Sequence, residues 1–66
     1  MNGKLLKLKI KENGMTFQEV SKALNITYIS FNNKTKGKYA FTLDEALKLK
    51  KMLNLSQETW DKIFVV

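Results

Sequence analysis

The side chains best suited to specific binding lie close together, between positions 28 and 38. Four of them offer amide, phenol or aliphatic groups on one face of a predicted helix: Tyr28, Ile29, Asn32 and Asn33. An asparagine amide can make two hydrogen bonds to the edge of adenine, and an aliphatic side chain can contact the thymine methyl group. The nearby lysines can contact phosphate as point charges. This combination predicts contacts to the base edges of A·T-rich duplex DNA.

These four residues also have another explanation. Asparagine is a poor former of helix interiors and is common where helices end, so Asn32 and Asn33 could serve local turn chemistry. Tyr28 and Ile29 could be partly covered by neighbouring helices. The sequence leaves both alternatives open.

The composition argues against catalysis and metal binding. The chain has no cysteine and no histidine, and its six acidic residues are scattered, mostly at predicted helix starts. These residue types cannot assemble the usual metal cluster or nucleophile-and-base pair. We therefore expect no catalytic residue, no metal, no cofactor and no small-molecule ligand. All basic residues are lysine, so the bidentate contact between arginine and guanine cannot be made.

The charge and the length are those of a small basic domain. The 66 residues carry 12 basic side chains against 6 acidic ones, a formal net charge of +6. Such a charge fits nucleic-acid binding, and equally a solvated lysine surface. The segment LLKLKIK has no apolar run long enough for a secretion or membrane segment, and the lack of cysteine fits a reducing compartment. We expect a cytoplasmic protein without membrane contact.

Four helix starts are marked by capping residues: Thr16, Thr27, Thr42 and Ser56. Glu19 and Glu45 each stand three residues after a threonine cap, which is the capping-box pattern. Asn25 and Asn54 can take the left-handed conformation that ends a helix. The pattern predicts four helices after Asn13, and the one that begins at Thr27 runs to about Thr35. The one long connection is expected from Lys34 to Ala40.

The segment before Asn13 fits two structures. Leu6, Leu8 and Ile10 alternate with lysines as in a strand, and Asn13-Gly14 could form a hairpin turn. Leu6 and Ile10 are also four residues apart, and Gly14 suits the position after a helix end. We favour a helix, because no second alternating run follows.

The apolar spacing predicts an all-α fold, with five short helices around one small core in a single domain spanning residues 1–66. The expected core residues are Leu6, Ile10, Phe17, Val20, Leu24, Ile26, Phe31, Leu43, Ala46, Leu49, Leu53, Leu55, Trp60, Ile63 and Phe64. Phe31 should point inward, which turns the opposite face of its helix outward. Ser21 is the small residue expected where the second and third helices cross.

Phosphate contacts are expected at two helix starts and in the lysine-rich segment. Free N–H groups at a helix start carry partial positive charge and can hold a phosphate. Lys36 and Lys38 are favoured over Lys34 for phosphate contact. The alternative is that these three lysines lie in a solvated loop. The expected phosphate-contacting residues are Thr16, Phe17, Gln18, Thr27, Lys36 and Lys38.

Three stretches, GMTFQEVSKALNITYISFNNK, NKTKGK and FTLDEALKLKKMLNLS, together resemble the phage Cro and repressor DNA-binding domains of the XRE helix-turn-helix family. The resemblance covers residues 6 to about 64. It implies a lambda repressor-like fold, in which the second and third helices form the helix-turn-helix and the third enters the major groove. It places base contacts at Tyr28, Ile29 and Asn33. Phosphate contacts fall at Phe17, Thr27 and Lys36 or Lys38, although Phe17 stands where the family often has glutamine.

Family members of this size typically act as dimers on palindromic operators. The apolar end of the chain, Ile63-Phe64-Val65-Val66, predicts dimer contacts at Phe64, Val65 and Val66, unless Phe64 completes the monomer core. The sequence thus predicts a homodimeric transcriptional regulator, a Cro-like repressor of phage or prophage type that binds double-stranded DNA. The alternative is a protein-interaction module on the same fold, antitoxin-like or a repressor antagonist, that binds an acidic protein.

Overall fold

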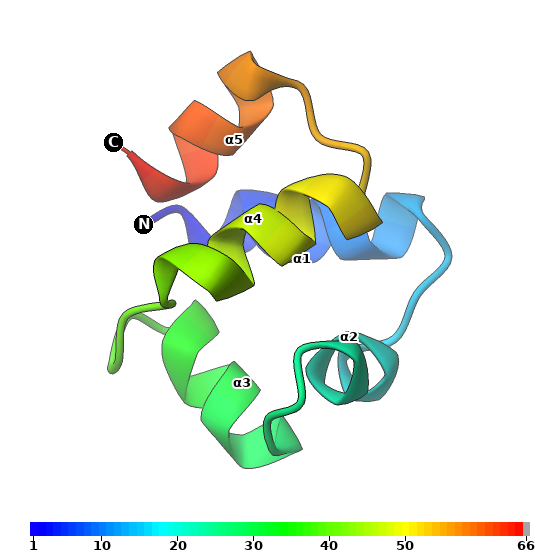
Figure 1. The fold of residues 1–66 in the computed structure, drawn as a ribbon, viewed down its shortest axis with the longest axis vertical. Coiled ribbons are helices and arrows are strands. Elements are labelled where there is room, and N and C mark those ends of the chain that lie inside the picture. The colour runs from blue at the N-terminus through cyan, green and yellow to red at the C-terminus, as the bar shows by residue number, and fades with distance from the viewer. Residues whose placement is uncertain (66) are drawn as a thin grey trace.

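The computed structural model describes residues 1–65, which form five α-helices and no strand. The helices are α1 (Gly3–Glu12), α2 (Phe17–Ala23), α3 (Tyr28–Thr35), α4 (Leu43–Met52) and α5 (Gln57–Phe64). Helices α1 and α4 cross the middle of the molecule, with α5 at one end and α2 and α3 at the other (Figure 1). The predicted all-α fold is confirmed, and the segment before Asn13 is a helix. None of these helices has the length and apolar content needed to cross a membrane.

Capping interactions define where all five helices begin, and the Asn2 side chain, which accepts a bond from the Leu5 amide, caps α1. The caps Thr16, Thr27, Thr42 and Ser56 each accept a hydrogen bond at 3.1 Å from the amide three residues later. In both capping boxes the glutamate, Glu19 or Glu45, accepts a bond from the cap amide in return. Asn25 and Asn54 have φ angles of 59° and 52°, so α2 and α4 end in the predicted left-handed conformation. Local sequence therefore sets most helix boundaries.

The core forms where the apolar stripes of the five helices meet. It consists of Leu6, Ile10, Val20, Leu24, Phe31, Leu49, Leu53, Leu55 and Ile63. Phe31 is fully buried, and the ring of Phe17 packs edge-on against it with 5.5 Å between centroids. Ser21 is buried as expected, and its hydroxyl donates a hydrogen bond to the Gln18 carbonyl. The core thus draws on every helix.

Two features around α4 differ from prediction. Leu43 was expected in the core but is 68% exposed. The buried stripe of α4 contains Ala46 and Leu49, and Leu43 lies about 90° around the helix from its centre. The long connection runs over residues 36–42 and starts later than expected, since Lys34 and Thr35 remain in α3.

The beginning of α1 packs closely against the end of α3. A Cβ atom at Gly3 would lie 2.1 Å from the backbone carbonyl oxygen of Thr35. The amide of Asn2 donates a 2.8 Å hydrogen bond to the carbonyl of Ile63 in α5. Gly3 has no predicted role in the sequence, because a close approach between distant segments has no local signature.

We predict that Gly3→Ala destabilises the fold by about 1–3 kcal/mol, the usual cost of forcing extra atoms into a packed site. Alanine is a better helix former than glycine by about 1 kcal/mol, so helix propensity alone predicts that Gly3→Ala stabilises the fold. Thermal melting followed by circular dichroism measures the effect. The neighbouring exposed substitution Lys4→Ala should stay within about 0.5 kcal/mol of the wild type. A Gly3→Ala variant that melts at or above the wild-type temperature would refute this account.

Candidate nucleic-acid interface

The burial of Phe31 and Thr35 sets the rotation of α3 about its own axis. At about 100° per residue, the side opposite Phe31 carries Ile29, Asn33 and Lys36. Ile29 is 72% exposed and Tyr28 is 44% exposed, so neighbouring helices leave both open to solvent. Two members of the predicted outward face, Tyr28 and Ile29, are therefore on the surface.

Asn32 and Asn33 are half-buried, and their side-chain amides make no hydrogen bond within residues 1–65. Other groups close the end of α3. The Thr35 hydroxyl donates to the Asn32 carbonyl at 2.8 Å, and the Lys38 amide donates to the Asn33 carbonyl at 2.9 Å. Turn chemistry thus uses the main chain of both asparagines and leaves their amides free for another partner.

The start of α2 offers two unused backbone donors. The amides of Thr16 and Glu19 are bonded within the capping box, whereas those of Phe17 and Gln18 have no partner among the described residues. The Phe17 ring packs against Phe31, so only its amide faces a possible ligand. The side chains of Thr16 and Gln18 are exposed.

The end of α3 places two lysines in solvent. Gly37, with φ of 82°, takes the left-handed conformation, and its amide donates to the Lys34 carbonyl at 3.1 Å. This helix ending suits glycine because other residues are strained there. Lys36 and Lys38 lie on either side of Gly37, are exposed, and form no ion pair within residues 1–65.

Lys34 has a different environment from these two lysines. Its Nζ lies 2.7 Å and 2.9 Å from the two carboxylate oxygens of Glu45, and both side chains are under 15% exposed. The same ammonium lies 5.8 Å from the centre of the Phe41 ring. Lys34 therefore joins α3 to the capping box of α4 and does not serve as a free charge. Lys34 was expected in the loop, because its partner is 11 residues away and leaves no local signal in the sequence.

The protonation of Glu45 reflects this pairing. Burial by itself would raise the pKa of the carboxyl group, but hydrogen bonds from the Lys34 ammonium and the Thr42 amide outweigh burial, and the pKa is lowered. The carboxylate is therefore charged and paired at neutral pH.

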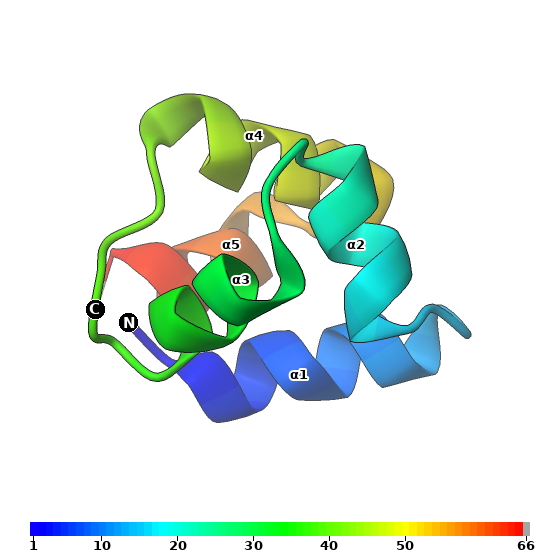
Figure 2. The same ribbon diagram turned by 90° about the horizontal axis from the view of Figure 1, so that it is seen from below.

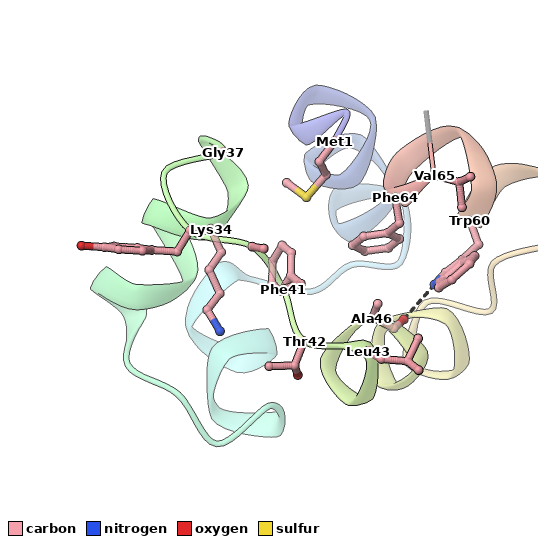
Figure 3. Close-up of a pocket in the computed structure, with 12 residues that line it drawn as sticks. Met1, Lys34, Gly37, Phe41, Thr42, Leu43, Ala46, Trp60, Phe64 and Val65 are labelled. Carbon is pink, nitrogen blue, oxygen red and sulfur yellow. Dashed lines mark hydrogen bonds between the residues drawn. The ribbon is translucent and has the colours of Figure 1, made fainter.

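An open apolar groove lies between the start of α4, the preceding loop and the end of α5 (Figure 3). The Phe64 ring packs within the monomer, 5.8 Å from the ring of Phe41 and 5.5 Å from that of Trp60. The Trp60 Nε1 donates to the Ala46 carbonyl at 2.9 Å, which fastens α5 to α4. Val65 lines the groove and is 66% exposed. The third predicted dimer residue, Val66, lies outside the described residues.

Three further apolar residues are exposed near this groove and were not predicted as a surface: Tyr39, Leu43 and Leu47. Tyr39 and Leu43 line the groove beside Val65. Leu43 and Leu47 are four residues apart and share one side of α4, beyond the stripe that the core uses. With Leu43 and Leu47, the apolar stripe of α4 is wider than the core requires, and this width was the signal in the sequence that could have predicted the exposed surface.

Comparisons of the chain with protein-family models, with curated proteins and with solved structures found no match. Proposals about its function therefore depend on the geometry described above.

We predict that Glu45→Gln destabilises the protein by about 1–3 kcal/mol at pH 7, because it leaves the half-buried Lys34 ammonium without its charged partner. The folded-state pKa of Glu45 is lowered, so the pair stabilises the protein above the ordinary glutamate value of 4.5. The difference between wild type and variant should shrink as the pH falls through 4.5 and below.

Urea unfolding at several pH values measures this difference. The control is Glu58→Gln, which removes the exposed ion pair with Lys62 and should change stability by less than about 0.5 kcal/mol. A difference between wild type and Glu45→Gln that is equal at pH 7 and pH 3 would contradict the assignment.

Proposed function

We propose that this protein is a sequence-specific, double-stranded DNA-binding regulator that places α3 in the major groove. The observation that carries the proposal is the outward face of α3, where Ile29 is largely exposed and two asparagine amides lack partners within residues 1–65. Water-facing surfaces are mostly rich in charged side chains, whereas this face combines an exposed aliphatic side chain with two amides that can bond to the edge of a base. Helices α2 and α3, joined by residues 24–27, then serve as a helix-turn-helix.

The dimensions of α3 suit this task. An α-helix with its side chains is about 10–12 Å in diameter, which fits a major groove about 12 Å wide, and the eight residues of α3 provide about two turns. Asn33 lies at the centre of the outward face and can bond the N6 and N7 atoms of adenine. Ile29, one turn earlier, can contact a thymine methyl group, while Tyr28 and Asn32 flank this pair. The proposed preference is for A·T pairs.

Phosphate contacts are proposed on both sides of α3. The exposed ammonium groups of Lys36 and Lys38 follow its last turn, and the free amides of Phe17 and Gln18 lie at the start of α2. The Thr27 hydroxyl accepts the Ser30 amide and retains its own proton for donation to a phosphate. These groups would fix the position of α3 along the groove.

A second copy of the chain is the proposed occupant of the apolar groove. Leu43, Leu47 and Val65 are each at least 47% exposed; Leu43 and Val65 line the groove together with Phe64, and Leu47 lies one turn from Leu43 on the same side of α4. Their burial against the same residues of a two-fold partner would remove this apolar surface from water. Two recognition helices related by that axis would bind a palindromic operator. Occupation of a promoter in the cytoplasm would then repress transcription.

We predict that Asn33→Ala lowers the affinity for a selected operator by about 5- to 150-fold, the equivalent of the 1–3 kcal/mol that one bidentate base contact contributes to discrimination. The operator is obtained by selecting bound duplexes from a random pool, and affinities are measured by fluorescence anisotropy at several salt concentrations. The salt dependence should stay unchanged, because asparagine is neutral.

Gln57→Ala, which removes an exposed amide on α5, is the control and should bind like the wild type. Equal binding by Asn33→Ala would exclude its role in base contact. A wild-type protein that binds no duplex at low salt would exclude the regulator and favour a module that binds an acidic protein.

We predict that Leu43→Glu weakens self-association by about 10- to 100-fold, because burial of one leucine contributes about 1.5–3 kcal/mol. Sedimentation equilibrium measures the dimer constant, and circular dichroism checks that helix content is retained. Leu8→Glu changes a leucine of similar exposure on α1 and should leave association intact. If the wild-type protein stays monomeric at high concentration, the proposed dimer is refuted.

A further inference from the structure

We propose that α1 supplies a second phosphate-contacting surface, formed by Lys4, Lys7 and Lys11 and named here the α1 lysine edge. The proposal rests on the proposed function, since it extends the same DNA interface beyond α2 and α3. The occupant is the sugar-phosphate backbone of the strand that borders the groove on the α1 side. The sequence alone does not separate these lysines from Lys9, which lies between them.

Helical spacing divides the lysines of α1 between two sides. Leu6 and Ile10 are fully buried and define the inner face. Lys4, Lys7 and Lys11 are three and four residues apart, which places them in one line along the helix. Lys9 falls on the other side of the buried stripe, at about 100° per residue.

Tertiary contacts show which side faces α2 and α3. The Lys7 ammonium lies 5.8 Å from the centre of the Phe17 ring, at the first residue of α2. The start of α1 meets the end of α3 where Gly3 approaches the Thr35 carbonyl. Helix α1 runs along the border of the surface formed by α2 and α3 (Figure 2). The α1 lysine edge is therefore next to the proposed DNA-binding surface.

Lys9 lies on the opposite side of α1. Its ammonium pairs with Glu12 at 3.0 Å. The same two residues line a shallow groove with Leu53 and Ser56, in the turn between α4 and α5. Lys9 is thus directed away from α2 and α3, and its charge is locally balanced.

The charge of the α1 lysine edge is not balanced in this way. Lys4, Lys7 and Lys11 form no ion pair within residues 1–65. The two nearest acids by position are already bonded, Glu12 to Lys9 and Glu19 to the cap amide of α2. Gly3, at the start of α1, lies against the Thr35 carbonyl at the end of α3. Lys36 and Lys38 follow Thr35 in the chain, so they extend the α1 lysine edge with two more ammonium groups that form no ion pair within residues 1–65. A polyanion that follows this border would neutralise up to five ammonium groups.

The spacing of the edge suits a DNA strand. Lys4 and Lys11 are separated by about 10 Å along α1, at 1.5 Å per residue. Successive phosphates of one DNA strand advance about 3.4 Å along the duplex axis while they wind around it, so neighbouring phosphates of one strand lie within reach of this edge. Each lysine that contacts one of them should add about one unit to the salt dependence of binding.

The test compares two double variants that remove the same number of charges. Lys7→Gln/Lys11→Gln alters the α1 lysine edge, and Lys9→Gln/Lys62→Gln alters the far side of α1 and helix α5, which lies at the opposite end of the molecule from α3 (Figure 1). Affinity for the selected operator is measured across a salt series. The first variant should lower the slope of log affinity against log salt by about two, and the second should keep the wild-type slope.

The α1 contact would be overturned if both variants kept the wild-type slope, or if both lowered the slope by the same amount. The proposed function would stand in either case. A wild-type protein without salt-dependent duplex binding would overturn both. Lys11→Gln alone preserves the contact between Lys7 and Phe17, and should lower the slope by about one. Circular dichroism melting confirms that each variant is folded.

Discussion

The burial of Phe31 is the constraint on which the surface chemistry depends. This side chain is fully buried, and the rings of Phe17 and Phe41 contact it edge-on with centroids 5.5 Å and 5.9 Å away. Burial of a phenylalanine contributes about 1.5–3 kcal/mol, and edge-on aromatic contacts add to it. Rotating α3 by one residue, about 100°, would forfeit these contacts. The outward position of Ile29 and Asn33 thus follows from a packing requirement on the other side of the helix.

Aromatic contacts extend from Phe31 across the molecule. The rings of Phe17, Phe31, Phe41, Phe64 and Trp60 form a continuous series, and each successive pair of centroids is less than 6 Å apart. The series runs from α2 through α3 and the loop to α5. The proposed DNA-binding face and the apolar groove are therefore two sides of one packed unit. Their relative position is set by close-packed rings, which do not slide easily past one another.

Lysine serves several purposes in this chain, and the surroundings of each one decide which. Lys34 is enclosed with Glu45 and holds two helices together, whereas Lys36 and Lys38 are exposed just beyond. In the proposed complex, the exposed ammonium groups would provide long-range attraction to phosphate without carrying sequence information. Without arginine, selectivity would have to come from asparagine amides and aliphatic contacts. Such a site needs a rigidly placed helix, because few groups discriminate between base pairs.

Much of the fold was predictable from the sequence because its signals are local. Caps such as Thr16 and Thr42 bond to amides three residues away, and Asn25 and Asn54 end helices by their own backbone preference. Apolar spacing likewise identified most core positions and the outward face of α3. These interactions join residues within one or two helical turns of each other, so they can be predicted from residue types and their spacing in the sequence.

Tertiary structure decided the features that depend on distant partners. The pairing of Lys34 with Glu45, the approach of Gly3 to the Thr35 carbonyl and the exposure of Leu43 follow from how the helices pack together. The spacing of the lysines in the sequence separates two sides of α1, but only the packing of the helices shows which side borders α2 and α3. A sequence states which residues share a helix face, and the folded core determines what that face meets, because burial is a property of the whole assembly of helices.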